Sequence, residues 1–308
     1  MSTNYNEQWR QAFAMFFSSK VFRHLLPGML VVSAYTALLV YLHHELGEVI
    51  KVTSFIYSLV GIVLGLLLVF RTNTAYDRWW EGRKLWGHLV NNSRNLALKL
   101  QVFLPGDQTE ARTFFKQAIP FYAHALHKHL LKEKISWEGK EILHPALSNW
   151  EASRHIPNRI AEAIIGKVHD LNRQQLITDS QLIILNEELR SFTDVCGACE
   201  RIKNTPIPYS YTAFIKKFIF IYVITMPIGF AFNLGYFTIP VTTFIFYVLA
   251  SLELIAEEIE DPFGKDSNDL PMQTMAANIK SNVEDILTDE KRTEVYTGQA
   301  LTQSLATS

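Results

Sequence analysis

Hydrophobic residues gather in four long stretches of this chain. Residues 218–252 contain no Asp, Glu, Lys or Arg, and this run exceeds the roughly 20 residues that a helix needs to cross a bilayer. The turn signal Asn233-Leu234-Gly235-Tyr236 divides the run into two spans. Two more stretches without charge when His is neutral, 24–44 and 52–70, lie near the N-terminus with a brief connection. The pattern predicts four transmembrane helices arranged as two hairpins.

The region between the two hairpins is predicted to be helical as well. Apolar side chains recur there at three- and four-residue steps, and they do not alternate as in a half-buried strand. Two such series are Ala118, Phe121, Tyr122, Ala125 and Leu182, Leu185, Leu189, Phe192. Residues 133–160 are rich in Pro, Gly, Asn and Trp and are expected to form a loop. The chain beyond about Asp269 is expected to be a polar tail.

These patterns give an all-α protein with five consecutive parts. Trp and Phe among polar residues in 8–23 are typical of a helix that lies in the membrane interface. The parts are an N-terminal interfacial helix (1–24), a first transmembrane hairpin (25–70), a cytosolic helical region (71–213), a second transmembrane hairpin (214–257), and a cytosolic acidic segment with the C-terminal tail (258–308).

Charge is segregated along the chain, although the totals nearly cancel. The 29 basic and 30 acidic residues leave a net charge of −1, which excludes a strongly basic nucleic-acid binder. Residues 71–217, however, hold 21 of the basic residues against 15 acidic ones. Because basic residues favour the cytoplasmic side, this region and both termini are expected in the cytoplasm. Two cysteines are too few for a disulfide framework.

The second span carries a bulky apolar stripe beside small residues. Ile62, Leu66 and Phe70 recur every four residues and share one helix face, while Gly61 and Gly65 lie on an adjoining face. If several copies surrounded an axis, the stripe would form hydrophobic rings able to gate ions by dewetting. The other interpretation is ordinary packing against lipid or another subunit, and spacing alone favours it.

Three blocks of residues then give the chain a resemblance. Directly after the second span, Arg71 and Arg78 stand two turns apart, beside carboxylates that can pair with them and tryptophans suited to the membrane surface. The blocks contain Arg71, Asp77, Arg78, Trp79, Trp80, Glu81; then Thr205-Pro206-Ile207-Pro208-Tyr209; and finally Glu260-Asp261-Pro262-Phe263-Gly264. In this order around the four spans, they resemble the bestrophin family of ion channels, bacterial branch.

The resemblance implies a homopentamer with one central pore in the bacterial inner membrane. It places the pore neck at Ile62, Leu66 and Phe70, and a second, cytosolic constriction at Gln181 with Ile177 nearby. The family is labelled as chloride channels, and bacterial members can favour monovalent cations such as sodium. The expected partners are further copies of the chain, the lipid bilayer and the permeant ions. No residue set resembles a catalytic site, so an enzyme is not expected.

The resemblance also raises calcium as a possible ligand, because animal members bind it after the Pro-Phe-Gly segment. By position, the oxygen ligands would be Asp261, Asp266 and Asp269, and hard cations do prefer oxygen. The acidic run here is interrupted by Lys265 and Ser267. The alternative, a solvated acidic turn at a subunit contact, is favoured.

Two further residue groups leave their roles open. Cys196 and Cys199 form a CxxC within a helical pattern, which favours a structural role over redox chemistry. His124, His127 and His129 lie close together in sequence, and surface or intersubunit histidines are favoured over a metal site there. The rival functions are a secondary transporter, or a membrane-anchored scaffold in which residues 71–213 do the work.

Overall fold

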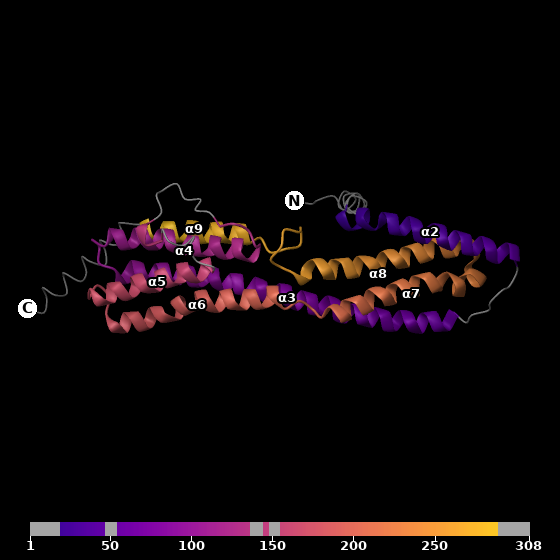
Figure 1. Ribbon diagram of the computed structural model, residues 1–308, viewed down its shortest axis with the longest axis horizontal. Helices are drawn as coiled ribbons and strands as arrows, with labels where there is room; N and C mark the ends of the chain where they lie inside the picture. Colours follow the sequence, from indigo (N-terminus) through magenta and orange to yellow (C-terminus); the bar gives the residue numbers. More distant parts are fainter. Residues whose placement is uncertain (1–18, 47–53, 136–143, 148–154, 289–308) are drawn as a thin grey trace, which may run out of the picture. The chain divides into compact units, whose positions relative to one another are not determined.

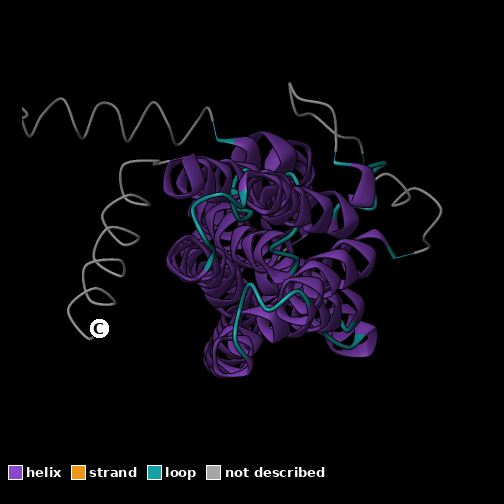
Figure 2. Cartoon of the chain, turned by 90° about the vertical axis from the view of Figure 1, so that its left-hand side faces the viewer, coloured by secondary structure: helices purple, strands orange, loops and turns teal. Residues whose placement is uncertain are grey.

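The described part of the chain is helical throughout its regular structure. The computed structural model describes residues 19–46, 54–135, 144–147 and 155–288, and these contain helices, turns and loops but no strand (Figures 1 and 2). This confirms the predicted all-α class. Residues 1–18 and 289–308, which hold most of the predicted interfacial helix and the end of the tail, lie outside the described residues.

The chain divides into two compact units. Unit one comprises residues 1–78 and 206–261, and unit two comprises residues 79–205 and 262–308. Helix α3 (Ser54–Phe103) supplies residues to both. The boundary expected at residue 70 therefore falls inside one helix, because the helical pattern does not stop where the apolar span ends.

Unit one consists of α2, the first part of α3, and a pair of helices that run side by side (Figure 1). Its helices are α2 (Lys20–Leu46), α3, α7 (Tyr209–Leu234) and α8 (Thr238–Glu260). Leu64 and Leu68 of α3 are buried against Ile219, Val223 and Met226 of α7. The side chains that pack these helices against one another are thus among the same residues that make the spans apolar.

The turn between α7 and α8 falls where the sequence predicts it. Helix α7 ends at Leu234, a single 3₁₀ turn (η3, Gly235–Phe237) follows, and α8 begins at Thr238. Gly235 has a φ of +51°, a left-handed conformation that glycine adopts without the steric cost other residues meet. The chain reverses here within three residues, which makes α7 and α8 a hairpin.

Three helical stretches of the described chain are long and apolar enough to cross a membrane. They are Lys20–Glu45, Phe55–Phe103 and Tyr209–Glu260, and the third contains both α7 and α8. Within unit one, polar side chains bond across the helices: the hydroxyls of Ser33 and Thr243 lie 2.7 Å apart, and the Tyr35 hydroxyl donates to the carbonyl of Ile224 at 3.1 Å. Such internal partners are needed where water is absent.

Unit two is a helical bundle with a large aromatic core. Besides the later part of α3, it contains α4 (Thr109–Leu130), the short η1 (Pro145–Leu147), α5 (Ile156–Arg173), α6 (Asp179–Asn204) and α9 (Met272–Thr288). Trp86 of α3, Phe114 and Tyr122 of α4, and Phe192 of α6 are fully buried in its core. Of the predicted loop at 133–160, residues 136–143 and 148–154 lie outside the described residues.

Helix α9 corrects the expectation of a polar tail after Asp269. Met275, Ile279, Val283 and Ile286 recur at three- and four-residue steps, and all four are buried. Their helix lies beside α4 in unit two (Figure 1). The many polar residues of this segment hid the pattern, since they occupy the outer face of an amphipathic helix.

Candidate functional site

The predicted neck residues share one exposed face of α3. Ile62 is 70% exposed in the single chain, and Leu66 and Phe70 are each 55% exposed. On the opposite face, Leu64 and Leu68 are fully buried against α7. The two faces of one apolar helix therefore have different surroundings: one is packed within the chain, and the other is left for lipid, another subunit or a pore.

The two glycines of α3 differ in what they contact. A Cβ atom on Gly61 would lie 2.8 Å from the hydroxyl of Tyr222, so the missing side chain lets α3 and α7 approach closely. A Cβ on Gly65 would meet no atom within 4 Å. Gly61 therefore serves packing inside the chain, whereas Gly65 borders the open face.

In unit one, the three sequence blocks meet at Glu260. The Arg71 guanidinium donates from Nη2 to Glu260 Oε2 at 2.7 Å, and the backbone N–H of Ile207 donates to Glu260 Oε1 at 2.7 Å. Arg78 donates from Nε to the Glu260 carbonyl at 3.0 Å. Arg71 is fully buried, and its Nε lies 3.7 Å from a carboxylate oxygen of Glu253. One carboxylate thus joins α3, the start of α7 and the end of α8.

Glu260 stands in the third block, but its sequence position alone does not distinguish it as the residue that joins the blocks. The signal available was its position: Glu260 is a carboxylate at the end of one apolar span, and another apolar span is followed by an arginine, Arg71, that needs a partner. A buried charge requires a partner, but the sequence offers Glu253, Glu257, Glu258 and Glu260 as candidates. Only the register of α3 against α8 decides between them.

In unit two, other residues of the first and third blocks hold the loop that precedes α9. The Trp79 indole N–H donates to the carbonyl of Asn268 at 2.8 Å. The Phe263 ring lies so close to Gly82 that a Cβ there would be 3.1 Å from it. Glu81 forms an ion pair with Arg201 at 2.6 Å. These residues act as packing and hydrogen-bonding groups.

Comparison with known proteins now identifies the family. A family model for bacterial and fungal bestrophin proteins matches residues 1–285. The chain belongs to the bacterial/fungal bestrophin family. A Nostoc protein named a voltage-dependent anion channel-forming protein is 36% identical, over 73% of this chain and 75% of its own length. The protein YneE of Escherichia coli K12, which bears the same description, is 34% identical over 85% of both chains.

A solved structure agrees with this membership in the bestrophins. The crystal structure of a bacterial bestrophin homologue from Klebsiella pneumoniae superposes with a TM-score of 0.79 at 27% identity, covering 86% of this chain and 98% of that one. The resemblance drawn from three short blocks is thus confirmed over nearly the whole sequence.

Of the two residues assigned to a cytosolic constriction of this bestrophin, Gln181 lies in the first turn of α6 and Ile177 stands just before the N-cap residue, Thr178. The Gln181 side-chain oxygen accepts the Thr178 N–H at 2.8 Å, and the Gln181 N–H donates to the Thr178 hydroxyl at 3.3 Å. This reciprocal pair is a capping box. Ile177 is buried in the core of unit two, so its side chain offers no exposed surface to a pore. Of the two, only the half-buried Gln181 is accessible.

The carboxylates considered as calcium ligands are arranged around turns. Asp261 directly follows α8 in unit one. In unit two, the Asp266 backbone N–H donates to the Asp269 carboxylate at 2.6 Å. Within the described part of the chain, the His, Cys, Asp and Glu side chains that lie close enough together to share one ion form a different group, which is in unit two.

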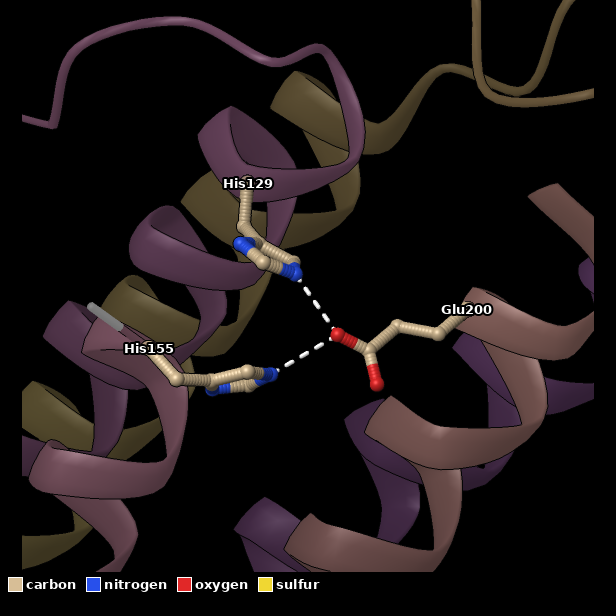
Figure 3. A group of neighbouring side chains, drawn as sticks. All are labelled: His129, His155 and Glu200. Atoms are coloured by element: carbon tan, nitrogen blue, oxygen red, sulfur yellow. Dashed lines mark hydrogen bonds and ion pairs between the residues drawn. The ribbon is translucent and has the colours of Figure 1, made fainter. Parts of the chain in front are cut away.

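That group consists of two histidines and a glutamate from three different helices (Figure 3). His129 Nε2 and His155 Nε2 each lie 2.7 Å from Glu200 Oε1. Burial raises the pKa of Glu200, but the hydrogen bonds from His155 and His129 outweigh this, and the pKa lies below its usual value. The carboxylate is therefore ionised at neutral pH.

This cluster differs from the histidine group that the sequence suggested. Of His124, His127 and His129, only His129 takes part, and His127 is buried in the bundle. Its partners, His155 and Glu200, were missed. Glu200 is 71 residues from His129 and 45 from His155, so no local spacing relates the three, and only the packing of α4, α5 and α6 brings them together.

The two cysteines are enclosed in the core of unit two. Both are free and buried. Burial and the nearby Glu200 charge raise the pKa of the Cys196 thiol to about 12, and burial raises that of Cys199 further still. Because the thiolate is the nucleophile and the metal ligand, protonated thiols in this setting are packing groups.

Proposed function

We propose that this protein is the subunit of a pentameric ion channel that conducts small monovalent ions passively across the bacterial inner membrane. The observation that carries the proposal is the divided surface of α3, whose apolar stripe of Ile62, Leu66 and Phe70 is exposed although its other face is packed. Five such stripes around an axis would form three apolar rings, and a narrow apolar passage restricts ions by dewetting.

Each subunit would cross the membrane four times. The spans are α2, the first part of α3, α7 and α8, and the turn at Gly235 makes the last two a hairpin. The excess of basic residues in 71–217 supports a cytosolic position for unit two and for both termini. The curated relatives, named as anion channel-forming proteins, support the transport role.

Apolar rings at the neck do not determine the sign of the permeant ion. They offer neither fixed charges nor a carbonyl filter, so discrimination between chloride and a cation such as sodium depends on fields outside the neck. The names of the relatives favour an anion. The charge excess of the cytosolic region, 21 basic against 15 acidic residues in 71–217, points in the same direction.

The proposal is tested by ion flux from proteoliposomes that contain the purified protein. Separate sodium and chloride gradients are applied, and passive flux down at least one of them is expected. Saturable exchange that requires a counter-ion on the other side, without passive flux, would support a secondary transporter and contradict the channel. No transport at all would support the scaffold in which residues 71–213 act.

Phe70→Ala tests the neck itself. Removing the ring that ends the stripe widens and wets the passage, so flux is expected to rise severalfold. The matched control is Phe220→Ala, which removes another exposed phenylalanine from α7, away from the stripe. Equal flux from the wild type and Phe70→Ala would mean that Phe70 does not line the narrowest region.

Two finer assignments stay predictions within this proposal. Gln181 as a cytosolic constriction predicts that Gln181→Leu changes ion selectivity without changing the neck.

Calcium binding by Asp261, Asp266 and Asp269 predicts that EGTA changes the flux of the wild type but not of an Asp266→Asn variant, whereas a solvated acidic turn predicts no effect of EGTA.

A further inference from the structure

Three side chains of unit two converge on one point at the meeting of three helices (Figure 3). His129 stands in the last turn of α4, His155 is the N-cap residue of α5, and Glu200 lies near the end of α6. Their ring nitrogens and carboxylate oxygen all lie within 4.8 Å of one another. The two imidazole rings are 4.6 Å apart between centroids. None of these residues belongs to the proposed pore neck.

The composition of the cluster favours a particular class of ion. Two imidazole nitrogens and one carboxylate oxygen are the ligands that zinc takes in three-residue sites with an open fourth position. Calcium and magnesium prefer sets made of oxygen alone. Each of the three side chains is only partly buried, which leaves room for water to occupy the remaining position.

The distances also fit an ion after a small outward adjustment. Both nitrogens lie 2.7 Å from the same oxygen. Zinc bonds to nitrogen and oxygen are about 2.0 to 2.2 Å long, so tetrahedral ligands stand roughly 3.3 to 3.5 Å apart. A shift of well under 1 Å per side chain would therefore replace the two hydrogen bonds with three metal bonds.

We propose that His129, His155 and Glu200 form a binding site for a divalent transition-metal ion of the zinc type. The ion would be held by Nε2 of each histidine and by the Glu200 carboxylate, and it would link the end of α4 and the start of α5 to α6. Such a link stabilises the bundle of unit two, because the ion binds the folded arrangement and not the separated helices.

The surroundings of the cluster leave the carboxylate available to a cation. Arg201, the basic residue next to Glu200 in sequence, forms its ion pair with Glu81 at 2.6 Å. Cys199, on the other side of Glu200, is buried and protonated. The interactions that lower the pKa of Glu200 therefore all come from the two imidazoles, His155 and His129.

Metal binding would displace one local hydrogen bond. His155 Nδ1 accepts the Asn158 backbone N–H at 3.2 Å, which caps the start of α5. Coordination through Nε2 moves the imidazole proton to Nδ1, and this cap is then given up. One long hydrogen bond is exchanged for a metal bond. A variant of His155 therefore has to remove the metal ligand while keeping a side chain that can cap α5.

The experiment measures bound metal and stability together, on the full-length protein without a histidine tag in detergent micelles. The protein is stripped with EDTA, dialysed, exposed to zinc chloride and freed of excess ion. About one zinc ion per chain is expected by elemental mass spectrometry. At a zinc concentration of about 100 times Kd, the Tm is expected to rise by about 4 °C, with no such rise in calcium or magnesium.

The variants separate metal binding from the helix cap. Glu200→Gln and His129→Gln each remove one ligand. His155→Asn removes the imidazole but keeps a side chain that caps helices well. Each is expected to weaken zinc binding at least about 100-fold, as measured by competition with a chromogenic zinc indicator. The control His169→Asn replaces an exposed histidine of α5 outside the cluster and should bind zinc as the wild type does.

The results are decisive in either direction. Loss of zinc and of the Tm rise in all three variants, with both kept in His169→Asn, would establish the site. A wild type that retains no zinc, or variants that retain as much as the wild type, would overturn the proposal and leave the cluster as a hydrogen-bonded link. Neither readout depends on ion conduction, so the outcome is independent of the channel proposal.

Discussion

Gly229 of α7 shows how closely single residues are fitted in unit one. The ring of Tyr57 from α3 lies directly over it, in the space that a Cβ atom would occupy. Tyr57 also contacts Phe230, with ring centroids 6.0 Å apart. The absence of a side chain at one position thus lets an aromatic ring pack against a helix backbone.

Gly229→Ala is therefore expected to destabilise the protein. The added methyl group forces the Tyr57 ring or the helix to move, and overpacking of this kind costs about 1 to 3 kcal/mol. The measurement is the Tm of the purified protein in detergent. Gly166→Ala on α5 is the control: a Cβ there meets nothing within 4 Å, and the helix gains about 0.5 to 1 kcal/mol from alanine. Equal Tm values for Gly229→Ala and the wild type would contradict the close packing.

At the scale of elements, Glu260 connects helices that are far apart in the sequence. Its two carboxylate oxygens accept from Arg71 of α3 and from the backbone of Ile207, ahead of α7. Helices in an apolar environment gain little from hydrophobic contact with one another, so polar links of this kind contribute to their arrangement. This carboxylate therefore links α3, the segment ahead of α7 and the end of α8.

Glu260→Gln should lower the stability of unit one by about 2 to 4 kcal/mol, because it removes the charge nearest to a fully buried arginine. The matched control is Glu257→Gln, on the same helix as Glu260, which breaks an exposed ion pair with Lys216 of α7 and should cost less than about 1 kcal/mol. Thermal unfolding followed by circular dichroism compares the two. Similar losses in both variants would show that burial of the pair does not matter.

The sequence predicts elements well where one physical signal dominates. Long uncharged runs and the Gly235 turn predicted the helices of unit one, since few segments of a soluble fold are that apolar. Helix α9 was missed because the polar residues of its outer face, read along the sequence, resemble a tail. Glu260, His155 and Glu200 were missed for another reason: their partners come from distant segments, and only the register between helices brings them together.

At the scale of the whole molecule, the exposed apolar surface extends beyond the membrane-type helices. In unit two, Ile183 of α6 is 75% exposed, and Ile184 and Val102 are exposed as well. Lipid can cover apolar side chains in unit one, but under the proposed topology, with unit two in the cytosol, it does not cover those of unit two. Large apolar side chains left exposed to water at this level are candidates for contact with another protein surface, and further copies of the same chain fit the proposed channel.

The proposal therefore predicts five chains in the assembled protein, measured by native mass spectrometry or by counting cross-linked bands. Ile183→Glu is expected to shift the population towards smaller species, because a charge buried at a subunit contact is costly. Thr193→Glu, at an exposed polar position of the same helix, controls for the added charge. A monomer or dimer in the wild type would leave the stripe of Ile62, Leu66 and Phe70 without an axis to surround. A closed ring of subunits is what turns one exposed helix face into a passage for ions.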